Sequence, residues 1–404
     1  MQHNKCLFFG LVASLLFFLS GCDSEPDGTT IHPIPPRAAP RAAPPAVVSH
    51  EEIPSSFVDR EPQKPIAGLM LPLSGQYAPL GEALLNTSML AFAELGIDTC
   101  RIRVVDTQGT PTGARNAAKA LAVADAKIVL GPLFAQEVQA AAPLLAKYNV
   151  PMIVFSNTPK VARENVFVFG LNPEDEIIAL LTFGFARSAN HFAAVIPEGT
   201  YGETVLRTIN IALAGRQQHI FATDTHQRTP QLDVIRYRPG ETNPKELAQK
   251  CATLSFEAVI VLETDSVIAP MLVRALKKQQ ETALILGPSA WKEPAFSFLP
   301  EMEGVYIALP SQEGGEAFFK RYRKTFAKDP IFPLGLLAFD AITALAQITD
   351  FSNLTHQWFV KEGNFLGLSG EYSFEKTGKV HRPLHVYQLK GQDIVPVRDP
   401  LNED

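Results

Sequence analysis

Short apolar runs alternate with helical stretches along most of the chain, and this alternation limits the possible folds more than any other feature. Residues 66–73 (IAGLMLPL), 101–106 (RIRVVD) and 191–197 (HFAAVIP) read as buried strands. Residues 81–96 and 114–125 carry apolar side chains at helical spacing. Strands that alternate with helices predict parallel sheets built from βαβ units. Because the pattern restarts near residue 191, we expect an α/β protein with two doubly wound, Rossmann-like lobes.

The residues that directly follow the predicted strands are candidates for a ligand site. In doubly wound sheets, ligands bind beyond the carboxyl ends of the strands. The candidates are Ser74, Tyr77, Ala135, Ser156, Asn157 and Thr158 in the first lobe, and Tyr201 and Asp265 in the second. A purely structural interpretation stays open for several of them. In that interpretation, Tyr77 and Tyr201 only pack in the wall of a cleft. Ser74 closes a turn after a strand, and Ser156 to Thr158 form a turn that leads into a helix.

Several motifs, in their order along the chain, resemble one protein family. They are LPLSGQYAPLG at 71–81, VVDTQGTP at 104–111, GPLFAQEVQAAAPLLAKYNVPMIVFSNTP at 131–159, and the pattern FxGxxGxxxF at 365–374. The set is similar to the leucine/isoleucine/valine-binding branch of the type I periplasmic binding proteins. The resemblance implies two lobes joined by three crossing segments, with a ligand cleft between them.

The same resemblance supplies expected domain boundaries. Lobe one is expected to comprise 65–187 with 309–350, and lobe two 188–308 with 351–398, followed by a tail at 399–404. The chain would therefore leave lobe one near Arg187, return near Leu309, and cross again near Phe351.

One subgroup of this family looks closer than the rest. The segments at 71–91 and 131–143 resemble lipoproteins that activate penicillin-binding proteins. That resemblance implies docking on a peptidoglycan synthase, without transport. The enteric members add an N-terminal helical-repeat domain, whereas this chain has a proline-rich stretch there. The alternative is the receptor of an amino-acid ABC transporter, with a permease as its partner and a small amino-acid-like ligand.

The family's amino-acid site carries over to this chain only in part. A hydroxyl at the start of the helix after the third strand holds the ligand carboxylate in the family, and Ala135 stands there. Thr158 keeps a hydroxyl in the next loop, and Tyr201 before Gly202 matches the family's aromatic position. The acid that holds the ligand ammonium is replaced by Ser289. Asp265 or Glu263, on a neighbouring loop, is the expected substitute.

The N-terminus resembles that of a bacterial lipoprotein. An apolar run at 7–19 ends in LSGC, which resembles a lipobox. We therefore expect a signal peptide at 1–21, lipid on Cys22 as a membrane anchor, and a disordered proline-rich tether at 22–64. The expected location is the periplasm. Asp23 favours the inner over the outer membrane, although the rule differs between bacterial groups.

Composition excludes several other classes of protein. A net charge of -6 over 404 residues gives no basic surface suited to nucleic acid. The chain contains no GxSxG, HExxH, Walker A or GxGxxG motif, so we expect neither an enzyme nor a cofactor. Cys100 and Cys251 fall in different predicted lobes, which favours two buried free thiols over a disulfide. No spacing of cysteine and histidine predicts a metal site.

Overall fold

The computed structural model describes residues 64–223 and 229–397. The expected signal peptide, Cys22, Asp23, the tether and the tail at 399–404 lie outside these residues. Residues from Glu61 on form one compact unit, and the four hydrophobic clusters of the described residues all lie within it. No described helix is long and apolar enough to cross a membrane.

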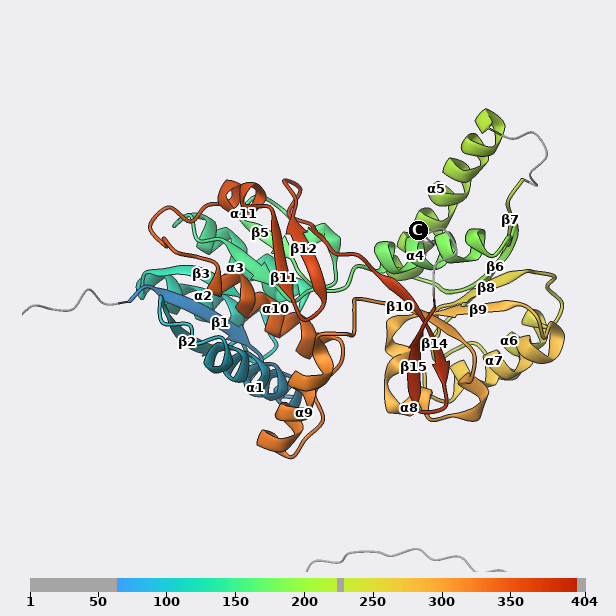
Figure 1. The fold of residues 1–404 in the computed structure, drawn as a ribbon, viewed down its shortest axis with the longest axis horizontal. Coiled ribbons are helices and arrows are strands. Elements are labelled where there is room, and N and C mark those ends of the chain that lie inside the picture. Colours follow the sequence, from blue (N-terminus) through green and yellow to red (C-terminus); the bar gives the residue numbers. More distant parts are fainter. Residues whose placement is uncertain (1–63, 224–228, 398–404) are drawn as a thin grey trace, which may run out of the picture. The chain divides into compact units, whose positions relative to one another are not determined.

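The first lobe is built on a parallel sheet with the strand order β2-β1-β3-β4-β5 (Figure 1). Its strands are β1 (Ile66–Leu71), β2 (Arg101–Asp106), β3 (Ala126–Leu130), β4 (Met152–Val154) and β5 (Val166–Val168), with helices α1 (Ala78–Glu94), α2 (Pro111–Val123), α3 (Ala135–Ala146) and the 3-10 turn η1 (Pro159–Val161). Successive side chains of a strand point to opposite faces. Leu69 accordingly joins one hydrophobic cluster with Leu84 of α1, and Met70 joins another with Leu121 of α2. Both faces are buried, which explains the continuous apolar run.

The second lobe contains a seven-stranded sheet with the order β15-β14-β10-β9-β8-β6-β7. Its strands are β6 (His191–Pro197), β7 (Gln231–Tyr237), β8 (Ala258–Val261), β9 (Leu284–Gly287), β10 (Tyr306–Leu309), β14 (His385–Lys390) and β15 (Asp393–Pro396). Its helices are α4 (Pro173–Ala186), α5 (Thr200–Thr223), α6 (Pro244–Cys251), α7 (Ile268–Gln279) and α8 (Pro294–Ser297), with 3-10 turns η2 (Ser289–Lys292) and η3 (Pro300–Met302). Strands β6 to β10 pair in parallel, whereas β14 and β15 are antiparallel additions. The predicted doubly wound α/β class is therefore confirmed for both lobes.

Side-chain caps fix where several helices begin. Thr110 accepts a hydrogen bond from the Gly113 amide at 3.0 Å, and Asn172 accepts one from the Glu174 amide at 3.1 Å. Proline follows each of these residues, at the first helical position, where its missing N–H would have no partner in any case. Thr110 thus fixes the start of α2, and Asn172 fixes the start of α4.

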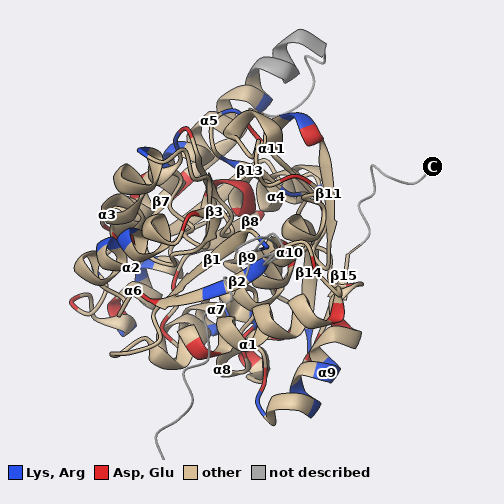
Figure 2. Ribbon diagram, turned by 90° about the vertical axis from the view of Figure 1, so that its left-hand side faces the viewer, with Lys and Arg blue, Asp and Glu red and all other residues tan. Residues whose placement is uncertain are grey.

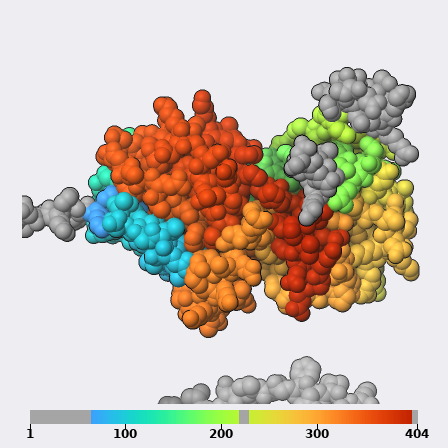
Figure 3. All heavy atoms as spheres, in the orientation of Figure 1, coloured from blue at the N-terminus to red at the C-terminus, as the bar shows by residue number. Residues whose placement is uncertain are grey.

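A small antiparallel sheet near the C-terminus completes the first lobe. It comprises β11 (Asn364–Gly367), β12 (Gly370–Phe374) and β13 (Val380–His381), and it is preceded by α9 (Gly315–Phe326), α10 (Leu334–Ala346) and α11 (His356–Glu362). The Phe374 ring lies 4.8 Å from that of Phe167 near β5, and the Tyr372 ring lies 5.1 Å from Phe169. In Figure 3 the orange and red C-terminal residues accordingly cover the first lobe beside the blue N-terminal ones.

Two of the boundaries expected from the sequence are wrong. Helix α4 belongs to the second lobe, because Ile177 and Leu180 pack with Phe192 of β6, so the chain leaves lobe one near Leu171 and not near Arg187. Residues 351–381 belong to the first lobe, because their aromatic side chains join its core. The third crossing therefore falls near Leu384, which packs against clusters of both lobes, and not near Phe351. Leu309 packs in the core of the second lobe, and Phe318 joins the core of the first.

Candidate functional site

The loop after β1 is held by a carboxylate of the neighbouring strand. Asp106, at the end of β2, accepts hydrogen bonds from the Leu73 and Gln108 amides at 2.8 and 2.7 Å. The Ser74 hydroxyl donates to the same carboxylate at 2.6 Å. Burial opposes the charge on Asp106, but these hydrogen bonds outweigh it and lower the pKa of the carboxyl. Ser74 thus helps to hold the loop in this conformation.

Aromatic rings gather beside this loop. The Tyr77 ring, at the N-terminus of α1, lies 4.4 Å from that of Phe134, which precedes α3. Gly109 has a φ of +64°, and a Cβ atom there would lie 2.7 Å from the Tyr77 ring. The backbone at Gly109 therefore approaches the ring as closely as glycine alone permits. Tyr77 is half-buried, and its ring forms part of the wall at the carboxyl edge of the sheet.

The start of α3 presents no hydroxyl, because Ala135 is its first residue. The helix is instead capped by Glu137, which is fully buried and accepts a hydrogen bond from the Phe134 amide at 2.9 Å. Burial raises the pKa of Glu137. Sequence reasoning missed this residue, although a glutamate at the third helical position is a known capping signal.

The loop after β4 contains the other three candidates of the first lobe. Ser156 is buried, and its hydroxyl accepts a hydrogen bond from the Thr158 amide at 3.2 Å. Asn157 is exposed, and Thr158 is half-buried just before η1. Ser156 therefore has a local structural role, whereas Asn157 and Thr158 keep side chains that a ligand can reach.

In the second lobe, Ser289 is joined to an acid that the sequence analysis did not select. The Ser289 amide and hydroxyl both donate to Glu176 of α4, at 3.1 and 3.0 Å. Glu176 is buried, and burial raises the pKa of its carboxyl to about 7 against the effect of these two hydrogen bonds. Asp175, the next residue along the helix, adds to this rise through repulsion. The position where the family places an acid thus carries a serine that binds a carboxylate from elsewhere.

Two tyrosines and a second acid lie close to this pair. Tyr201, at the start of α5, is 40% exposed, and burial of its hydroxyl together with the Glu176 charge raises its pKa. Tyr237 ends β7, and burial and the Glu263 charge raise its pKa. Glu263 follows β8, is buried, and accepts hydrogen bonds from the amides of Thr264 and Asp265 at 2.8 and 2.7 Å. The carboxyl edge of this sheet therefore combines phenol groups with two buried acids.

The Asp265 carboxylate is bonded to the start of a helix. It accepts hydrogen bonds from the Val267 and Ile268 amides at 2.8 and 3.0 Å, and these bonds lower its pKa. The side chain therefore caps the start of α7. Of the two expected substitutes for the family's acid, Glu263 lies in the cluster with Tyr237, and Asp265 serves the helix.

Near the third crossing segment, a buried hydrogen-bond network involves residues of the FxGxxGxxxF pattern, and Ser369 links Asp340 to Arg382 in it. Asp340 of α10 is fully buried and accepts hydrogen bonds from the Leu368 and Ser369 amides. Ser369 also bonds Arg382, which donates from Nε at 2.9 Å. A Cβ atom on Gly367 would lie 2.2 Å from Asp340 Oδ1, so this glycine lets the loop close over the carboxylate. Burial raises the pKa of Asp340 to about 6, although the Arg382 charge opposes the rise.

These arrangements describe a two-lobed binding protein. Polar and aromatic residues line the carboxyl edge of each parallel sheet, and the described residues contain no group of side chains that could hold a metal ion. Residues 67–393 match the family model described as periplasmic binding protein, so the chain belongs to the periplasmic binding protein family. Membership implies a periplasmic location and a binding role instead of catalysis.

Solved structures of both expected kinds share this fold. A putative branched-chain amino acid ABC transporter protein from Rhodospirillum rubrum has a TM-score of 0.70 and 17% identity, over 82% of this chain and 99% of that one. The C-domain of LpoA from Haemophilus influenzae, a regulator of PBP1A, has a TM-score of 0.62 and 19% identity, over 82% and 100%. Similarity at this level of identity establishes the fold alone.

A sequence relative exists in Rickettsia prowazekii. The uncharacterized protein RP748 is 23% identical over 163 residues. The match covers 40% of this chain and 43% of that protein, so it spans less than half of the relative's length.

Proposed function

We propose that this protein is a lipid-anchored periplasmic regulator that activates peptidoglycan synthesis by docking on a penicillin-binding protein. The observation that carries the proposal is the Ser289–Glu176 pair. A free amino acid needs a carboxylate that faces its ammonium group, because an unpaired buried charge is costly. The side chain at that position is a hydroxyl, and the Ser289 hydroxyl and amide both donate to Glu176.

Two further features support this role. At the start of α3, Ala135 lacks the hydroxyl that would meet a ligand carboxylate. The C-domain of LpoA, described as a regulator of PBP1A, matches the described lobes along its whole length. In the proposal, lipid on Cys22 holds the protein to a membrane, and the proline-rich tether lets the lobes reach a synthase.

The test is a reconstitution with a peptidoglycan synthase. A chain beginning at Glu61 keeps all four hydrophobic clusters and lacks only the anchor and tether. We expect this chain to bind a purified bifunctional penicillin-binding protein of the same bacterium and to raise its rate of peptidoglycan synthesis at least about twofold. A leucine-binding receptor of the same fold is the control and is expected to have no effect. Absence of both binding and rate enhancement would contradict the proposal.

The second candidate function is that of a binding protein for an amino-acid ABC transporter. It is favoured by Glu176 and Glu263, two buried acids beside Tyr201 and Tyr237. One of these acids would then replace the missing partner of the ligand ammonium. This alternative predicts that a Glu176→Gln variant loses affinity for the ligand, as measured by calorimetry against a panel of amino acids.

A further inference from the structure

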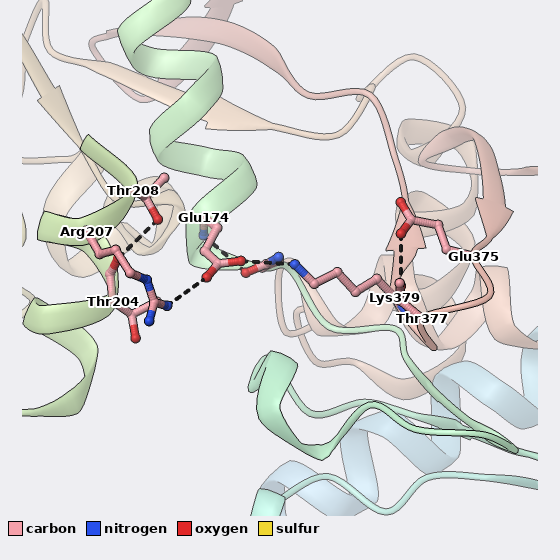
Figure 4. A network of polar contacts seen from close by, with 8 residues as sticks. Glu174, Thr204, Arg207, Thr208, Glu375, Thr377 and Lys379 are labelled. Carbon is pink, nitrogen blue, oxygen red and sulfur yellow. Dashed lines mark hydrogen bonds and ion pairs between the residues drawn. The ribbon is translucent and has the colours of Figure 1, made fainter. Parts of the chain in front are cut away.

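An ion pair bridges the two lobes beside the first crossing segment. Glu174, in the first turn of α4, lies between two cations from different elements (Figure 4). Its Oε2 atom is 3.1 Å from Nζ of Lys379, which precedes β13 in the first lobe. Its Oε1 atom is 3.3 Å from Nη2 of Arg207 on α5, within the second lobe. Of these two contacts of Glu174, the one with Lys379 joins α4 to the first lobe, and the one with Arg207 stays within the second.

The next residue of α4 has no such partner. Among the described residues, no hydrogen bond or ion pair reaches the Asp175 side chain, although it is half-buried. The charged groups that act on it most strongly are Lys379 and His381, which attract it, and Glu174 and Glu375, which repel it. Asp175 is thus a carboxylate withdrawn from water without a direct contact to a cation.

A matching donor lies on the opposite lobe. Arg382 is buried at the end of β13, where Nε donates to Ser369 at 2.9 Å and Nη1 to the Phe169 carbonyl at 3.4 Å. Its third nitrogen, Nη2, is buried without a hydrogen-bond partner. Among charged groups, Asp340 acts on this guanidinium most strongly, and Asp175 acts on it as well. A buried donor without an acceptor destabilises the protein, so an arrangement that supplies an acceptor is favoured.

We propose that these residues form a two-position latch between the lobes, in which Glu174–Lys379 is the pair formed in this structure and Asp175–Arg382 is the pair formed after a small reorientation. Neighbouring side chains of a helix point about 100° apart, because each turn contains 3.6 residues. A rotation of α4 relative to β13 that brings Asp175 to Arg382 therefore carries Glu174 away from Lys379. The latch concerns the orientation of the lobes and does not depend on which partner or ligand the protein binds.

The test measures the distance between the lobes in the chain beginning at Glu61. Spin labels are attached to cysteines placed at Val123 on α2 and Val267 before α7, which are 81% and 75% exposed. Cys100 and Cys251 remain unlabelled near neutral pH, because they are buried and burial raises the pKa of each thiol to about 11. Distance distributions from pulsed electron spin resonance then report the populations of the two orientations.

Opposite shifts in two isosteric variants are the expected result. Glu174→Gln weakens the formed pair and raises the population of the second orientation, and Asp175→Asn lowers it. Each change is expected to alter the ratio of the two populations about two- to fivefold, as for a partly exposed ion pair. Arg207→Gln is the matched control, because it removes the cation on the second-lobe side of Glu174 and leaves Lys379 in place. Unchanged distributions in the Glu174 and Asp175 variants, or shifts in the same direction, would overturn the proposal.

Discussion

Replacement of Glu176 by glutamine is predicted to remove a pH-dependent loss of stability. Burial raises the pKa of Glu176 from 4.5 to about 7 in the folded protein. The folded state therefore holds this proton more tightly than the unfolded chain. The resulting stabilisation is complete below pH 4.5, declines as the pH rises, and is lost above about pH 7.

The size of the effect follows from that rise in pKa. Each pKa unit corresponds to about 1.4 kcal/mol, so ionisation of Glu176 costs about 3 kcal/mol of folding free energy by pH 8. Glutamine keeps the shape of the side chain and an acceptor for the Ser289 amide, but it cannot ionise. We expect the free energy of unfolding of Glu176→Gln, relative to wild type, to increase by about 3 kcal/mol between pH 4.5 and pH 8.

Urea unfolding at several pH values measures this difference. Other buried acids, such as Asp340 and Glu137, contribute equally to both proteins, so the comparison isolates Glu176. Glu316→Gln removes one exposed carboxylate on α9 and controls for the change in net charge. A difference between Glu176→Gln and wild type that stays constant from pH 4.5 to pH 8 would refute the reasoning.

Three further predictions concern the core and the crossing segments. Asp340→Ala leaves the buried Arg382 guanidinium without the opposite charge that favours it and is expected to lower the free energy of unfolding by about 3–5 kcal/mol in urea titrations. Gly367→Ala places a methyl group 2.2 Å from the Asp340 carboxylate and is expected to lower the free energy of unfolding by about 1–3 kcal/mol. Because both changes act on one contact, the double variant should lose less stability than the sum of the two single variants. Alkylation of Cys100 and Cys251 with a thiol reagent at pH 7 should be slow in the folded protein and fast in urea, since both thiols are buried; rapid alkylation of the native protein would contradict their placement.

Local sequence pattern predicted most of the elements that build the two sheets. Strands 101–106 and 191–197 have the predicted bounds, and helix α3 begins at the predicted residue. These segments combine uniform apolar runs with clear stop signals, so local chemistry determines them. The placement of α4 and of β11 to β13 could not be predicted in this way. Their placement depends on the hydrophobic core in which Ile177 and Phe365 pack, and only the tertiary structure determines this.

The candidate site was predicted less completely for a related reason. Ser74, Tyr77 and Tyr201 follow strands, and the rule for carboxyl ends of parallel strands finds such residues. Glu176 comes from a helix that was assigned to the other lobe, so nothing in the sequence connected it with Ser289. Arg382 lies more than two hundred residues from Phe169, whose carbonyl accepts its hydrogen bond. Contacts between residues so far apart in the sequence can be predicted only once the fold is known.

Basic and acidic residues are mixed over the described part of the chain (Figure 2). Lysine and arginine are interspersed with acidic residues in the face that Figure 2 shows, and no side of it is uniformly basic. Arg321 of α9 and Lys328, two residues after the end of that helix, pair with Glu94 and Glu82 of α1.

The most direct test of the proposed function is thermal unfolding of the chain beginning at Glu61 in the presence of leucine, isoleucine, valine and other free amino acids. A ligand at 100 times its dissociation constant stabilises the folded state by about 2.7 kcal/mol, which corresponds to a rise of about a few degrees in Tm. The proposed regulatory role predicts no rise with any of these amino acids, because the position that would receive the ammonium group carries Ser289, bonded to Glu176. A clear and saturable rise would contradict it and would identify the protein as a transport receptor.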